Sequence, residues 1–179
     1  MAEAVSASTW AKRLIFLALA FLIIIMQLVP LDMRPPRWAA PDLLLAFTLA
    51  WVARRPDCLP VAVVAGIFLL ADLLFQRPPG LWAALVVILS ETLRRRSREF
   101  RNMPLLLEWG TIAFGIVAIT LANRVVLAIV MTPQAPLGLT LSQMVLTIAI
   151  YPLVVFVNHS LLGVRRLAPG AVDGKGHRL

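Results

Sequence analysis

The sequence predicts an all-α polytopic membrane protein with six transmembrane helices and both termini in the cytoplasm. Of its 179 residues 60% are hydrophobic and only 15% are charged, and the mean hydropathy is +0.87. A water-soluble domain of this size could not cover so much apolar surface. The apolar residues fall into runs separated by proline. In lipid each run must be helical, because an open strand leaves backbone groups unpaired at several kcal/mol apiece.

The breakers between the runs define the expected spans. These lie at roughly 14–31, 38–53, 59–75, 80–94, 104–131 and 138–163. The first run follows Lys12 and Arg13 as a signal peptide would, but no small-x-small cleavage site follows it, so we interpret it as an uncleaved span. We expect one transmembrane domain over 1–167 and a flexible cytoplasmic tail over 168–179.

Two spans are shorter than a bilayer requires. A helix needs about 20 residues to cross roughly 30 Å of hydrocarbon, whereas the runs 38–53 and 80–94 hold about 16 and 15 residues. Both end in arginines, which can snorkel to the inner surface. The bundle is therefore expected to be compact and uneven, with short helices beside long tilted ones.

The basic residues set the expected orientation. With the N-terminus inside, three basic residues fall in outer loops: Arg34, Arg37 and Arg77. Thirteen fall in inner loops: Lys12, Arg13, Arg54, Arg55, Arg94, Arg95, Arg96, Arg98, Arg101, Arg165, Arg166, Lys175 and Arg178. Translocating Lys and Arg in short loops is disfavoured, so both termini are expected in the cytoplasm. The net charge of +8 then reflects membrane topology, and nucleic acid is not an expected partner.

The stretch RRRSREFR at 94–101 is the densest charged feature of the chain. It forms a cytoplasmic basic patch of Arg94, Arg95, Arg96, Arg98 and Arg101. Such a patch can bind anionic lipid headgroups, at about 1 kcal/mol per basic residue near the surface, or an acidic face of a partner. An ordinary positive-inside anchor is the alternative, and the sequence favours it.

Charged residues inside or near the spans require partners or helix ends. Asp42 follows Pro41 at the outer start of the second span, where it can cap the helix. Asp72 lies near the outer end of the third span, where the helix dipole repels an anion, and Arg124 lies at a similar depth. We expect an outer polar layer of Asp42, Asp72, Asn123 and Arg124 that includes an Asp72–Arg124 ion pair.

The remaining polar residues favour structural roles. Glu91 and Glu108 are expected near the inner surface, with Glu91 and Arg95 at i, i+4 spacing, and solvated surface pairs are favoured over a proton relay. Single polar residues in apolar runs suit interhelical hydrogen bonds. They are Gln27, Gln143, Asn158 and His159.

The sequence contains no pattern typical of an enzyme. It lacks a Gly-x-Ser-x-Gly motif and the phosphate-loop and dinucleotide glycine patterns. With two His and one Cys it offers no clustered metal ligands, and Cys58 can form no intramolecular disulfide. A non-enzymatic protein without a cofactor is expected.

Three stretches resemble the bacterial rod shape-determining MreD family. They are PDLLLAFTLAWVARRPD at 41–57, GIFLLADLLFQRPPGLWAAL at 66–85 and LRRRSREFRNMPLLLEWG at 93–110. The second is the most specific, since the family often has Gly, an apolar turn, Asp-Leu-Leu, a short loop and Gly-Leu. The family-motif positions fall on Pro41, Asp42, Arg54, Arg55, Pro56, Gly66, Asp72 and Gly80. The chain departs from the family at 76–78, where Gln-Arg-Pro replaces a small residue.

The resemblance implies a membrane scaffold of the cell-elongation complex in the bacterial inner membrane. The implied direct partner is the bitopic protein MreC, with the actin-like MreB and a peptidoglycan glycosyltransferase and transpeptidase pair in the same complex. It also implies a bundle similar to the substrate-binding component of energy-coupling-factor transporters, with a pocket near the outer face. A small-molecule-binding or transport subunit that uses this pocket is the alternative function.

Overall fold

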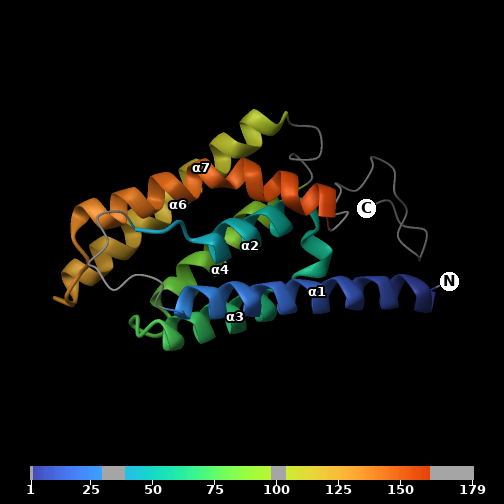
Figure 1. Ribbon diagram of the computed structural model, residues 1–179, viewed down its shortest axis with the longest axis horizontal. Helices are drawn as coiled ribbons and strands as arrows, with labels where there is room; N and C mark the ends of the chain where they lie inside the picture. The colour runs from blue at the N-terminus through green and yellow to red at the C-terminus, as the bar shows by residue number, and fades with distance from the viewer. Residues whose placement is uncertain (1, 30–38, 98–103, 162–179) are drawn as a thin grey trace.

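The computed structural model describes residues 2–29, 39–97 and 104–161, and within them the chain is all-helical, as predicted (Figure 1). The elements are α1 (Ala2–Leu28), α2 (Leu43–Arg54), the short 3-10 helix η1 (Pro56–Cys58), α3 (Val61–Leu74), α4 (Leu81–Arg95), α6 (Leu105–Ile129) and α7 (Leu137–Leu161). The expected tail at 168–179, together with Arg98 and Arg101, lies outside the described residues.

Within the described residues, three helices are long and apolar enough to cross a membrane. The spanning stretches are Thr9–Leu28 in α1, Leu105–Ile129 in α6 and Leu137–Ser160 in α7. The apolar helices α2 and α3 are shorter, with 12 and 14 residues. These lengths indicate a membrane protein whose long helices are accompanied by short ones.

Helix α2 lies in the middle of the bundle, between α1 and α7 (Figure 1). Every residue from Leu44 to Arg54 is buried. Phe47 stacks on Phe16 of α1 with ring centroids 5.2 Å apart, and Trp51 packs against both rings. Because other helices surround it, α2 does not need the length of a lipid-exposed helix, which explains why so short an apolar run is stable here.

Helix α7 continues through Pro152. Proline has no N–H, so the carbonyl of Ile148, four residues earlier, loses its helical donor. The indole N–H of Trp109 in α6 donates to this carbonyl at 2.9 Å. A neighbouring helix therefore satisfies the backbone group that Pro152 leaves free, as a membrane interior requires.

Candidate functional site

A buried ion pair and a tyrosine hydroxyl together join three helices. Arg54, at the last turn of α2, pairs with Glu108 of α6, with Nη1–Oε1 at 2.7 Å and Nη2–Oε2 at 3.3 Å. Tyr151 of α7 donates its hydroxyl to Glu108 Oε1 at 2.7 Å. The side chains of Arg54 and Glu108 are only 6% and 1% exposed. The bidentate geometry fixes the orientation of both side chains, so the three residues hold α2, α6 and α7 in register.

This network corrects two predictions. Arg54 does not snorkel to a surface, and Glu108 is not part of a solvated pair, because both side chains are buried against each other. Sequence reasoning missed Tyr151 as well. The available signal was that Tyr151 is the only tyrosine in the chain, and that a carboxylate and a guanidinium bordering apolar runs need partners inside the bundle.

Asp42 confirms the predicted helix cap. Its carboxylate accepts the N–H of Leu45 at 2.9 Å and thereby satisfies a free donor in the first turn of α2. Its own N–H donates to Thr147 Oγ1 of α7 at 2.8 Å. Asp42 therefore sets where α2 begins and also attaches that end to α7.

Asp72 also holds the start of a helix, but a different one from its own. Its Oδ2 accepts the N–H groups of Gly80 and Ala83 at 3.1 Å each, across the connection from α3 to α4. Gly80 caps α4 with φ +87, a left-handed conformation that favours glycine. The Asp and Gly positions of the most specific family-like stretch thus form one structural unit. An anion beside the first N–H groups of α4 is also favoured by the helix dipole.

The expected Asp72–Arg124 ion pair is wrong. Arg124 Nη1 donates to Thr140 Oγ1 at 2.7 Å and to the carbonyl of Ala135 at 3.2 Å, so it closes the connection between α6 and α7. Arg77, in the loop between α3 and α4, is instead the arginine next to Asp72: its backbone N–H donates to the Asp72 carbonyl at 2.9 Å, and its side chain lines one cavity with Asp42. Sequence depth alone could not distinguish the two arginines, because loop geometry decides which of them approaches.

Three of the four expected layer residues nevertheless line one cavity of about 330 Å³, namely Asp42, Asn123 and Arg124. The α3–α4 and α6–α7 connections lie at the same end of the bundle (Figure 1). Arg77 and Gln134 of these connections also line the cavity, together with Trp82 at the start of α4 and Thr140 and Gln143 at the start of α7. A carboxylate, two guanidiniums, an indole and amides therefore face one space, which suits a small molecule carrying both charge and hydrogen-bonding groups.

The other family-motif positions have structural surroundings. Pro41 precedes the α2 cap, Arg55 ends α2 with its N–H on the carbonyl of Trp51 at 2.7 Å, and Pro56 opens η1. Gly66 lies on the exposed side of α3, with nothing within 4 Å of an added Cβ. The structure therefore does not bring Gly66 together with Asp42 or Asp72.

Of the three described arginines of the basic patch, two are exposed and one is paired. Arg95 and Arg96 are exposed. Arg94 instead pairs with Glu91 at 2.9 Å and donates to the carbonyl of Leu59. The expected Glu91–Arg95 pair is thus replaced by an i, i+3 pair, since Arg94 lies on the side of α4 that faces the α2–α3 connection.

The described residues contain no group of three or more His, Cys, Asp or Glu side chains that could hold a metal ion. Comparison with protein-family models, with curated proteins and with solved structures finds no match to the chain. The bearing of the site on function therefore depends on its geometry and on the sequence resemblance.

Proposed function

We propose that the chain is a non-enzymatic membrane scaffold of the bacterial cell-elongation complex. In this role it binds MreC in the inner membrane and supports rod shape and lateral peptidoglycan synthesis. MreB and the glycosyltransferase and transpeptidase pair join the same complex. Anionic lipids contact the exposed arginines at the inner end of α4.

One observation carries the proposal. The resemblance is most specific at the spacing from Asp72 to Gly80. In this chain that spacing lets the Asp72 carboxylate accept the N–H groups of Gly80 and Ala83 at the start of α4. Asp42 and Arg54 likewise act within the bundle. These three motif residues thus fix helix ends and helix contacts within the bundle, which supports a structural role over a catalytic one.

The membrane arrangement forms part of the proposal. All six helices cross or enter the inner membrane with both termini in the cytoplasm, as the excess of inner Lys and Arg favours. The bundle adopts the arrangement of energy-coupling-factor substrate-binding components. The polar cavity then opens on the outer side, and the basic patch faces the cytoplasm.

Copurification tests the scaffold. A tagged chain extracted in mild detergent is expected to bring MreC with it in a stable ratio. Asp72→Ala, which frees the start of α4, is expected to reduce the yield of the complex, whereas Gly66→Ala, on an open surface, is not. Recovery of the folded chain with neither MreC nor a wall synthase would exclude the scaffold.

The polar cavity favours a second candidate, a small-molecule-binding or transport subunit. Its lining of Asp42, Arg77 and Arg124 offers both signs of charge to a ligand. Mass spectrometry of the purified chain is then expected to find a retained small molecule, or an ATPase module is expected to copurify. An empty cavity, together with recovered MreC, would favour the scaffold over this candidate.

A further inference from the structure

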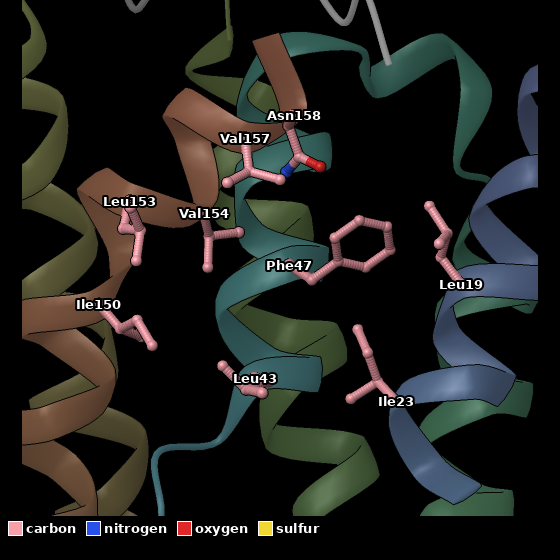
Figure 2. A pocket seen from close by; sticks show the side chains of 9 residues that line it. All are labelled: Leu19, Ile23, Leu43, Phe47, Ile150, Leu153, Val154, Val157 and Asn158. Atoms are coloured by element: carbon pink, nitrogen blue, oxygen red, sulfur yellow. The ribbon is translucent and has the colours of Figure 1, made fainter. Parts of the chain in front are cut away.

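Two cavities of similar volume differ in the chemistry of their lining. The first lies along α2 between α1 and α7, and eight of the nine side chains that line it are apolar (Figure 2). Such a lining does not distinguish one apolar occupant from another. The second is the polar cavity of about 330 Å³, at the end of the bundle that holds the α3–α4 and α6–α7 connections (Figure 1). Its charged and amide side chains can select a chemical class of ligand.

The two arginines of the polar cavity carry N–H groups that no described residue accepts. Arg77 makes no side-chain hydrogen bond or ion pair within the described residues, and its guanidinium lies 5.2 Å from the ring centroid of Phe75. Arg124 uses Nη1 for two bonds, one to Thr140 and one to the carbonyl of Ala135. Since a guanidinium has five N–H groups, all five remain on Arg77, and five minus two leaves three on Arg124.

These N–H groups are accessible to a ligand. The side chains of Arg77 and Arg124 are partly exposed, as are those of Asn123 and Gln143, whose amides form no hydrogen bond within the described residues. None of these four residues contributes an atom to the set of fully buried, unpaired polar atoms. All four line the polar cavity. A ligand in the cavity can therefore replace water on their guanidinium and amide groups.

The acidic side chains near the cavity are already engaged by helix N-termini. Asp42 accepts a first-turn N–H of α2, and Asp72 accepts two N–H groups at the start of α4. A helix N-terminus carries a partial positive charge of roughly half a unit, which offsets part of each carboxylate charge. Asp42 is the only carboxylate in the lining, against two guanidiniums. The lining therefore has an excess of positive charge and of hydrogen-bond donors.

We propose that the polar cavity binds a small anion that carries a carboxylate or phosphate group, held by Arg77 and Arg124. The planar fork of a guanidinium matches both groups by paired N–H···O bonds. The amides of Asn123 and Gln143 can donate to the remaining oxygens. The inference rests on the second candidate function, for which it names the ligand class, and the scaffold function does not depend on it.

The volume limits the size of the anion. Ligand pockets span about 300–1,000 Å³, and the polar cavity is at the lower end of this range. It has room for a small metabolite or for the headgroup of a phospholipid, but not for acyl chains as well. The same phosphate chemistry therefore has two sources, a free anion and a lipid headgroup.

Titration of the purified full chain in detergent tests the ligand class. The probes are inorganic phosphate and succinate, added at constant ionic strength and followed by isothermal titration calorimetry, with choline as a cationic control. We expect at least one of the two anions to bind saturably at one site, and choline not to bind. If the folded chain binds neither anion, or binds choline as well as the anions, the proposal is overturned.

Arg77→Gln tests the location, because the side chain has no hydrogen-bond partner among the described residues whose loss would unfold the chain. Lys12→Gln is the matched control: it removes the same charge from a partly exposed side chain on α1, a helix that contributes nothing to the lining. Arg77→Gln should weaken anion binding roughly ten- to hundredfold, the effect of losing hydrogen bonds to a charged group. Lys12→Gln should leave it unchanged. Equal losses in both variants would overturn the site, because they would show general attraction to a basic protein.

Native mass spectrometry of the chain as purified distinguishes the two sources. A bound phospholipid that phosphate displaces, and that Arg77→Gln loses, would support the site and assign it to a lipid headgroup. A bound small anion, or probe binding to a lipid-free chain, would support it and assign it to a free anion. A retained neutral or cationic molecule without anion binding would overturn the anion class but leave the second candidate function standing. A cavity that retains nothing and binds neither probe would exclude both.

Discussion

Replacing Glu108 by Gln leaves the guanidinium of Arg54 buried without a counter-charge. The shape of the side chain is kept, and Tyr151 still has an oxygen to which it can donate. At an effective dielectric constant of about 20, two charges about 4 Å apart attract by about 4 kcal/mol. Truncating one partner of a buried pair costs about 3–5 kcal/mol in measured cases. We therefore expect Glu108→Gln to lower the free energy of unfolding by about this amount.

The assay is SDS titration of the purified chain in mixed micelles, followed by far-UV circular dichroism. Glu91→Gln is the matched control, because the Glu91–Arg94 pair is 31% and 25% exposed and should cost less than about 1 kcal/mol. Arg54→Met combined with Glu108→Leu removes both charges, so it should lose less stability than either single variant. Adding Tyr151→Phe, which removes the hydroxyl left without an acceptor, should bring stability closer to the wild type.

The result that would refute this reasoning is additivity. If Arg54→Met and Glu108→Leu lose stability independently and their losses sum in the double variant, the two side chains are not coupled. A Glu108→Gln loss no larger than that of Glu91→Gln would contradict the burial of the pair.

Two backbone features give further predictions. Gly80→Ala should lower the free energy of unfolding by about 1 kcal/mol, because Ala is strained at φ +87. Gly66 lies in the middle of α3 with free space around it, so Gly66→Ala should be neutral or slightly stabilising in the same SDS titration. Equal losses at Gly80 and Gly66 would contradict the role of the left-handed turn. Trp109→Phe should cost about 1–3 kcal/mol, because the carbonyl of Ile148 loses its donor. The same change should cost much less in a Pro152→Ala chain, where the helical N–H is restored, and an equal cost in both backgrounds would show that the indole bond and the proline are unrelated.

Apolar runs and breakers were sufficient to predict α2, α3, α4, α6 and α7, but not η1, nor the start of α1 at Ala2, twelve residues before the expected span. The α2 cap at Asp42 could also be predicted, because proline followed by a carboxylate at the start of an apolar run is a local signal. The spacing of the breakers placed the boundaries of α4 and α6 to within a few residues. These features depend on residues that are close together in the sequence, so the sequence alone is enough to predict them.

Interactions between distant segments could not be predicted in the same way. Arg54 and Glu108 are 54 residues apart, and Arg54 and Tyr151 are 97 apart. Their pairing depends on how α2, α6 and α7 pack. The sequence gives the depth of each side chain along its helix, but not the direction around the helix axis in which the side chain points. The same limit made Arg124 rather than Arg77 the expected neighbour of Asp72, since the path of a loop depends on contacts that no periodicity encodes.

The buried arginine at the end of α2 also has a consequence for biogenesis. Helix α2 is only 12 residues long, about 18 Å at 1.5 Å per residue, so it cannot cross a bilayer by itself. Arg54 leaves the ribosome 54 residues before Glu108, which is roughly 3–11 s at about 5–20 residues per second. During that interval the nascent chain carries a short helix with an unpaired cation, and stable insertion has to wait for the segment that supplies the carboxylate. We therefore expect a chain that stops before Glu108 to be degraded faster than the full chain, because its Arg54 has no buried carboxylate to pair with.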